Sequence, residues 1–297
     1  MSERSVIVGV DGSSGSQRAL DWAVDKADVF GPVSAVAAYH VEALGDGIGT
    51  PALYQDLSAL LAEDARDRLA TNLEPNHSDL LETSRIVRGH PGPALIRSAE
   101  GQALLVVGSR GRSALAETLL GSVGSHCVKH STVPVAVIPE STPVDKPLDH
   151  IVVGVDGSDN ATAALRWAIR HLGPNGRITA VHSWQISPYV LDMVPPIPTL
   201  NEEARAAVEK AVEQAIAAES ATATDPDARA SDLRAAIELE IKMGDARNVL
   251  PAAAETADLL VVGSRGHRGA SYLLLGSVTT SLLHHPVVAT VVVPLTD

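Results

Sequence analysis

The chain has 297 residues, 45% of them apolar and 20% charged, which is typical of a folded protein of about two domains. Its 23 basic and 36 acidic residues give a net charge of −13, which disfavours binding along a nucleic acid backbone or an anionic membrane, so we expect neither partner. A single cysteine, Cys127, excludes an intrachain disulfide and a cysteine-rich zinc site, and the absence of a long apolar run or a signal peptide predicts a cytoplasmic protein.

The first half of the chain alternates between strand-like and helix-like segments. A β-branched run, Ser5–Val10, is typical of a strand buried on both faces, and Asp-Gly-Ser then precedes a helical pattern that includes the apolar residue Trp22. The further elements that we expect are strands over Val33–His40, Leu81–Val87, Ala103–Val107 and Val133–Ile138, and helices over Leu53–Leu73, over Pro93–Glu100 and after Gly121.

The second half repeats the first. VGVDGS at 8–13 returns at 153–158, and VVGSRG at 106–111 returns at 261–266, so the offset grows from 145 to 155 residues. The second copy is expected to have strands over His150–Val155, Arg177–His182, Ala236–Ile241, Leu259–Val262 and Val287–Val293, with helices over Asn201–Ala218, over Ala246–Ala257 and after Gly276. A proline-bearing stretch separates the copies, which predicts domains at 1–140 and 150–297 joined by a linker at 141–149.

This alternation predicts an α/β fold with two tandem Rossmann-like domains, each with a mostly parallel sheet of five strands covered by helices on both faces. Such sheets bind ligands beyond the carboxyl ends of their strands.

A glycine-rich segment follows the fourth strand of each copy. Gly108-Ser109-Arg110-Gly111 is followed after nine residues by Gly121-Ser122, and the second copy keeps both spacings. Glycine lets a ligand approach the backbone, and the amides of such a loop and of a helix start can bind an anion. The segment could also be a simple strand-to-helix loop, but its repetition favours an anion site. We therefore expect alanine at Gly108 or Gly263 to block phosphate or ribose.

Other residues have open alternatives. Asp11 and Asp156 follow the first strand of each copy and could be helix N-caps or contact a ligand. His40 and His182 end the second strands, which favours packing or capping, and Cys127 is expected to be a buried structural thiol. The proline-rich loop over residues 185–200 could be a lid or a docking surface.

Both halves, from Ser5 to Ile138 and from His150 to Val293, resemble the ATP-binding subgroup of the universal stress protein family in its tandem, actinobacterial form. The resemblance implies an adenine nucleotide alpha hydrolase-like sheet of strand order 3-2-1-4-5, ATP with Mg²⁺, pseudo-dimeric packing of the two domains and a possible homodimer. Carried over by position, Asp11 and Asp156 would contact the adenosine part, and Val41 and its polar counterpart Ser183 would line the adenine. The residues that would hold ribose and phosphates are Gly108, Gly111, Gly121 and Ser122, and likewise Gly263, Gly266, Gly276 and Ser277.

Two functions agree with these residues. One is a nucleotide-dependent switch in the stress or growth response, read by a protein partner that the sequence does not identify. The other is a slow ATPase or phosphotransferase, which needs positioned metal ligands and a group that orients the nucleophile. The glycine segments share no carboxylate, since Glu117 corresponds to Tyr272, and this favours binding over turnover.

Overall fold

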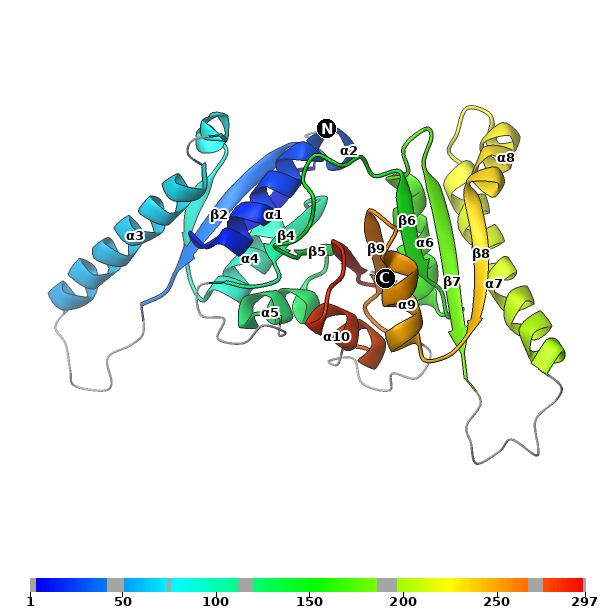
Figure 1. Ribbon diagram of the computed structural model, residues 1–297. Coiled ribbons are helices and arrows are strands. Elements are labelled where there is room, and N and C mark those ends of the chain that lie inside the picture. The colour runs from blue at the N-terminus through cyan, green and yellow to red at the C-terminus, as the bar shows by residue number, and fades with distance from the viewer. Residues whose placement is uncertain are drawn as a thin grey trace. The chain divides into compact units, whose positions relative to one another are not determined.

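The computed structural model describes residues 4–41, 51–73, 76–111, 120–185, 197–266 and 275–295. The chain divides into two compact units, Met1–Asp145 and Lys146–Asp297. Each unit has its own parallel strands with helices beside them (Figure 1).

The first unit has the predicted alternation of strands and helices. Its elements are β1 (Val6–Val10), α1 (Ser14–Asp25), α2 (Ala27–Phe30), β2 (Val33–Tyr39), α3 (Pro51–Leu73), the 3₁₀ helix η1 (Ser78–Glu82), β3 (Arg85–Arg88), α4 (Pro91–Ala99), β4 (Leu104–Gly108), α5 (Ser122–His130) and β5 (Val135–Ile138). The strand order is β3-β2-β1-β4-β5 and each pairing is parallel. This confirms the expected order 3-2-1-4-5.

The second unit has the same topology. Its elements are β6 (His150–Gly154), α6 (Asp159–Arg170), β7 (Arg177–Trp184), α7 (Ile197–Ser220), α8 (Pro226–Ala236), β8 (Ile237–Met243), α9 (Ala246–Ala254), β9 (Leu259–Gly263), α10 (Ser277–His284) and β10 (Thr290–Val293). The parallel order is β8-β7-β6-β9-β10, the same path as in the first unit.

The central strands are buried on both faces, as their β-branched sequences predict. In the first unit α1 and α3 cover one face of the sheet, and α4 with α5 covers the other (Figure 1). Val6, Ile7 and Val8 of β1 are at most 1% exposed, and Trp22 of α1 and Trp167 of α6 are 1% and 5% exposed. In the strand order, β2 and β4 lie on opposite sides of β1, so the chain reverses its winding direction between β1 and β4. In open sheets the carboxyl ends of the strands at such a point form a crevice for ligands.

The third strand of the first unit is shorter than predicted. We expected a strand over Leu81–Val87, but η1 extends to Glu82 and β3 begins at Arg85. The intervening residues join β2 through hydroxyl groups instead of ladder bonds: Ser34 donates to the Thr83 carbonyl, and the Ser84 hydroxyl accepts from the Ala35 amide at 3.1 Å. Side chains that bond the backbone in this way compete with regular pairing.

Helix α8 was not predicted. Asp225 is its N-cap and accepts from the Ala228 amide at 3.0 Å, with Pro226 in the first turn. Asp before proline at a helix start is a recognisable signal. It lies in the longer middle of the second copy, where the repeat provides no template.

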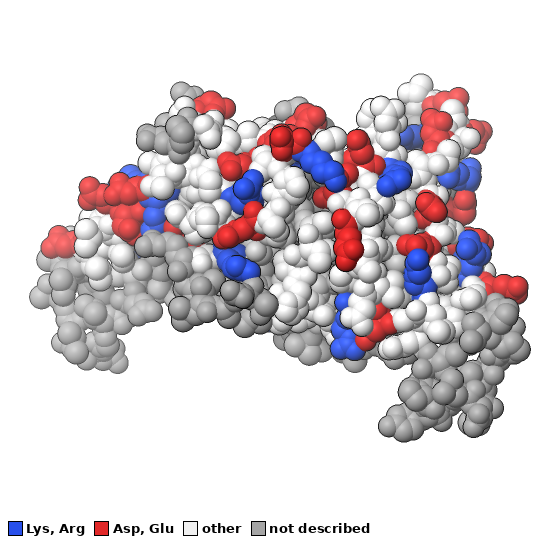
Figure 2. All heavy atoms as spheres, viewed as in Figure 1, with Lys and Arg blue, Asp and Glu red and all other residues white. Residues whose placement is uncertain are grey.

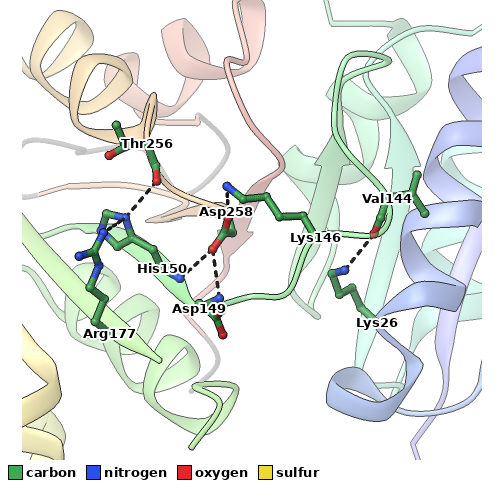
Figure 3. Close-up of polar contacts among 8 residues, drawn as sticks. All are labelled: Lys26, Val144, Lys146, Asp149, His150, Arg177, Thr256 and Asp258. Atoms are coloured by element: carbon green, nitrogen blue, oxygen red, sulfur yellow. Dashed lines mark hydrogen bonds and ion pairs between the residues drawn. The ribbon is translucent and has the colours of Figure 1, made fainter. Parts of the chain in front are cut away.

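Each end of the linker region is fixed to its own unit (Figure 3). The Lys26 ammonium, on a residue only 4% exposed, pairs with Asp25 and donates to the Val144 carbonyl at 3.0 Å. In the second unit Asp258 pairs with Lys146, and its Oδ2 accepts from the amides of Asp149 and His150 at 3.0 and 2.8 Å. Buried or part-buried charges therefore hold both ends of the segment that joins the units.

Acidic and basic side chains alternate over the face of the molecule drawn in Figure 2. The ion pairs of the chain include Arg205 with Glu209 and Arg247 with Asp245. Among the residues with described structure, none of the helices has the length and apolar character needed to cross a membrane.

Glu219 of α7 joins two helices of the second unit. Its carboxylate accepts from Arg166 Nε at 2.7 Å and from the Arg170 guanidinium at 2.7 and 2.8 Å. Burial opposes ionisation of this group, but the hydrogen bonds from Arg170 and Arg166 outweigh burial and lower the pKa of Glu219. A carboxyl group whose pKa is lowered by folding stabilises the protein above its unfolded pKa, and this stabilisation is lost as the pH falls through the lowered value.

Replacing Glu219 with glutamine should therefore lower the unfolding free energy by about 1–2 kcal/mol near neutral pH. The difference from the parent chain should shrink as the solution is acidified, because the parent carboxylate becomes protonated. Urea unfolding at neutral pH and at about pH 3 measures both effects.

The matched control is Glu213→Gln. Glu213 makes a similar paired contact with Arg234, but both side chains are more than half exposed, at 52% and 54%. Exposed pairs contribute little, so this variant should unfold like the parent. An equal loss of stability in the two variants would contradict the role assigned to Glu219.

Candidate functional site

The turn after the first strand has the same hydrogen bonds in both units. Asp11 Oδ1 accepts from the amide of Ser13 at 3.0 Å and from its hydroxyl at 2.5 Å. Asp156 Oδ1 accepts from the amide and hydroxyl of Ser158 at 3.0 and 2.6 Å. The serines are the N-caps of α1 and α6, so the alternative that the aspartates themselves cap these helices is wrong.

Glycine is required in the middle of this turn. Gly12 and Gly157 have φ values of +80° and +83°, in the left-handed region that other residues rarely adopt. The two copies therefore need Asp-Gly-Ser for one conformation, in which aspartate orients serine and serine caps the helix.

The second carboxylate oxygen of each aspartate faces the glycine loop. A Cβ placed on Gly111 would lie 2.8 Å from Asp11 Oδ2, and one on Gly266 would lie 2.3 Å from Asp156 Oδ2. The fold thus brings the turn after the first strand against the loop after the fourth strand. In both units the aspartate of the turn therefore lies beside the second glycine of the loop, Gly111 or Gly266.

Gly108 and Gly263 are explained by packing within the protein. A Cβ on Gly108 would lie 2.5 Å from the Gly15 carbonyl oxygen in α1, and one on Gly263 would lie 2.8 Å from the Asn160 carbonyl carbon in α6. Backbone atoms cannot move aside as a flexible side chain can. An alanine methyl group here would meet a helix backbone, and our expectation that it would also block phosphate or ribose stays a prediction.

Gly121 and Gly276 are required neither by their backbone conformation nor by their contacts with the described residues. Their φ values are −59° and −61°, which any residue can adopt. The nearest atoms to an added Cβ would be the Gly111 amide nitrogen at 3.8 Å and the Arg265 Cα at 3.4 Å, both ordinary contacts. The described residues would therefore tolerate a methyl group at either position.

These two glycines begin helices α5 and α10. Each is an N-cap without a side-chain hydrogen bond to the helix, and the side chains of Ser122 and Ser277, which follow them, are exposed. The Gly121 amide donates to the Ser109 carbonyl at 3.0 Å, and the Gly276 amide donates to Ser264 at 2.9 Å, which closes each loop onto its strand. A helix start of this kind presents amide hydrogens and the positive end of the helix dipole.

Val41 and Ser183 lie one strand away from these turns. Both are half-buried, Val41 just after β2 and Ser183 near the end of β7, and these strands pair with β1 and β6. Their predicted contact with adenine stays a prediction. The expectation for the neighbouring histidines is confirmed, since His40 packs against His90 with ring centroids 3.4 Å apart and the rings tilted by 31°, and His182 Nδ1 bonds the Val155 carbonyl at 2.7 Å.

Several other residues considered in the sequence lie outside the described part of the chain. These include Glu117, Tyr272 and residues 186–196 of the predicted loop over 185–200. The end of that prediction is wrong, since α7 already begins at Ile197. Within the described part, one residue beside the turn was missed: Asn72 of α3, which is 2% exposed and accepts from the Gly12 amide at 2.8 Å. Nothing in the helical pattern or in the repeat singles it out.

The comparisons with known proteins agree with this architecture. The model of the universal stress protein family matches residues 3–139 and 147–294. Universal stress protein Rv2005c of Mycobacterium tuberculosis is 31% identical over 295 residues, covering 95% of this chain and 94% of that protein, and a universal stress protein of Mycolicibacterium smegmatis is 28% identical with 94% and 93% covered.

Solved structures share the fold across the whole chain. The universal stress protein of Archaeoglobus fulgidus covers 99% of both chains with a TM-score of 0.65 at 19% identity, and one from Pseudomonas aeruginosa covers 99% of this chain and 94% of its own with a TM-score of 0.56 at 15% identity. The fold is thus a Rossmann-like α/β domain built twice in one chain. The protein belongs to the universal stress protein family, with two tandem domains of that family.

The glycine contacts predict that alanine lowers the stability of the chain at two of these positions and leaves it almost unchanged at the other two. Gly108→Ala and Gly263→Ala should each lower the unfolding free energy by about 2–3 kcal/mol, because the methyl group overpacks against a helix backbone. Gly121→Ala and Gly276→Ala should change it by less than about 0.5 kcal/mol. Urea unfolding of the four variants without added nucleotide measures this. A stable Gly108→Ala chain would show that α1 is not packed as described.

Cys127 of α5 should be chemically inert in the folded protein. The residue is fully buried, which confirms the expected structural thiol, and burial raises the pKa of the thiol to about 12. The thiolate is the reactive species, so a thiol reagent should modify the native chain only as fast as the chain opens. In guanidinium, where the chain is unfolded, the same reagent should modify Cys127 at once. Rapid modification of the native chain at neutral pH would contradict this burial.

Proposed function

We propose that each unit binds one ATP, with Mg²⁺ carried on the triphosphate, and that ATP occupancy makes this universal stress protein a regulatory switch in the stress or growth response. The phosphates would lie at the starts of α5 and α10. The nucleoside would lie over the turns at Asp11 and Asp156.

The observation that carries this proposal is the pair of glycines that the fold does not need. Gly121 and Gly276 have ordinary φ values and room for a Cβ among the described residues, yet both copies have glycine there. Each is a helix N-cap that makes no side-chain hydrogen bond to the helix, and an exposed serine follows it. An anion that approaches the backbone closely accounts for both features.

The turn after the first strand suits the nucleoside part. Asp11 and Asp156 use Oδ1 to hold the turn, and Oδ2 points towards the glycine loop. A carboxylate oxygen there can accept a hydrogen bond from a ribose hydroxyl or from the adenine amino group. Val41 would add an apolar contact to the base, while Ser183 would contribute less apolar area, so the first site should bind the base more favourably.

Binding fits these residues better than rapid turnover. Phosphoryl transfer requires a group that orients the attacking water. The Asp11 and Asp156 carboxylates instead accept hydrogen bonds that hold their own turns, which supports a structural and ligand-contacting use. Slow hydrolysis remains the alternative, and it is separated from binding by experiment.

The test is ATP binding by the purified chain with and without Mg²⁺. Calorimetry should give two ATP molecules per chain, and saturation at about 100 times the dissociation constant should add roughly 2.7 kcal/mol to each unit that binds. The double variant Gly121→Ala/Gly276→Ala should fold like the parent but lose this effect, because its methyl groups would occupy the place of a phosphate oxygen. AMP, which lacks the outer phosphates, should bind more weakly.

Gly173→Ala is the control, since a Cβ at Gly173 would meet no described atom within 4 Å and the residue follows the end of α6, which begins at the turn. This variant should bind ATP like the parent. Failure of the parent to bind ATP would refute the proposal. Release of many phosphates per chain within minutes would favour the ATPase alternative.

A further inference from the structure

Asn72 links helix α3 to the turn of the first candidate nucleotide site. Its Oδ1 accepts from the Gly12 amide at 2.8 Å and lies 3.3 Å from the Ser16 hydroxyl. Its Nδ2 donates to Gln17 Oε1 at 3.0 Å. An asparagine that is 2% exposed thus has both its carbonyl and its amide group engaged, all with α1 or the turn before it.

These bonds act on the backbone that positions Asp11. Gly12 has a left-handed conformation, and a part-buried amide in such a turn needs an acceptor. Ser16, which also contacts Asn72, accepts from the Asp11 amide at 3.3 Å. Two successive amides of the turn are therefore held directly or through one hydroxyl by a residue from a different helix.

The same network continues along α1. Gln17 Nε2 donates to Asp21 Oδ1 at 2.9 Å, and His77 Nε2 lies 2.8 Å from the same oxygen. The side chains of His77 and Asp21 are only 12% and 27% exposed. Through the bond to Gln17, these contacts fix the orientation of the Asn72 amide group, so that its oxygen faces the Gly12 amide.

The second unit joins its helices differently. Positions 161, 162 and 166, which correspond to Ser16, Gln17 and Asp21, are alanine, threonine and arginine. Arg166 and Arg170 bind Glu219 of α7, along the helix from the turn. Within the described part of that unit, no side chain of α7 bonds the amide of Gly157, although its φ of +83° matches that of Gly12.

We infer that Asn72 is a positioning residue of the first nucleotide site and makes the two sites unequal. It holds the Asp11–Ser13 turn in place before ligand arrives, so less ordering is left for binding to accomplish. The second site lacks this support and binds the same nucleotide more weakly. The inference rests on the proposed function and specifies how the two sites differ.

The experiment compares Asn72→Leu with Asn72→Asp. Leucine has a similar volume but no acceptor, whereas aspartate keeps an oxygen for Gly12. ATP affinity is measured in the Gly276→Ala background, which reports the first site, and in the Gly121→Ala background, which reports the second. Asn72→Leu should weaken ATP binding about tenfold at the first site and leave the second unchanged, and Asn72→Asp should restore most of the loss.

Hydrogen exchange of the Gly12 amide provides a readout that does not need nucleotide. Exchange should be faster in Asn72→Leu by about tenfold or more and close to the parent rate in Asn72→Asp. If the parent chain binds no ATP, the proposed function fails, and this measurement still decides whether Asn72 positions the turn. If Asn72→Leu does not fold, Asn72→Ser serves instead, because its shorter side chain cannot reach Gly12.

Glu219→Gln is the matched control, because it weakens the hydrogen bonds between α7 and α6 in the second unit and has no contact with the turn at Asp156. It should leave ATP affinity at the second site unchanged. The inference is overturned if Asn72→Leu binds ATP at the first site as tightly as its parent, or if the Gly12 amide exchanges at the parent rate. Equal affinities of the two sites in the parent chain would also overturn it.

Discussion

The candidate site depends on one close contact between backbones. At the end of β4, Gly108 lies so near the first turn of α1 that a Cβ would be 2.5 Å from the Gly15 carbonyl oxygen. Any larger residue would push the strand end and the helix apart. Because the loop after β4 starts at this contact, it passes over the turn after β1, where Asp11 faces Gly111. Gly263 and Asn160 form the same contact in the second unit, so both sites are assembled by glycine packing before any ligand is considered.

The glycines of the motif therefore have different physical roles although they look alike in the sequence. Gly12 is needed for a left-handed conformation, and Gly108 for the approach of a helix. Gly121 is needed for neither, and it stands at a helix start. A glycine that the described residues around it do not require is the better candidate for contact with a ligand, because under the proposed function the close approach of a phosphate would account for it. This distinction needs coordinates, since a repeated spacing is equally consistent with all three roles.

Much of the fold was predictable because each central strand is a short β-branched run between turn residues, and because the chain contains the pattern twice. The prediction failed where side chains replace backbone pairing, as at Ser84, and where the second copy has residues without a counterpart, as in α8. Asn72 could not be predicted either, because its role depends on how two helices pack. A polar residue within a long helix is usually solvated, and only the packing of the end of α3 against α1 makes this one part of the site.

The two units have the same turn geometry, but in the described part of the chain only the first turn is held by a side chain of the long neighbouring helix. Asp11 and Asp156 hold Ser13 and Ser158 at amide distances of 3.0 Å in both, yet Asn72 supports the first turn from α3, while Glu219 ties α7 to α6 along the helix from the second. A support that is in place before binding reduces the ordering that the ligand must accomplish. Under the proposed function, the chain then has a site that fills at low nucleotide concentration and another that fills only at higher concentration. Two such sites would let one polypeptide respond over a wider range of ATP levels than two equal copies could.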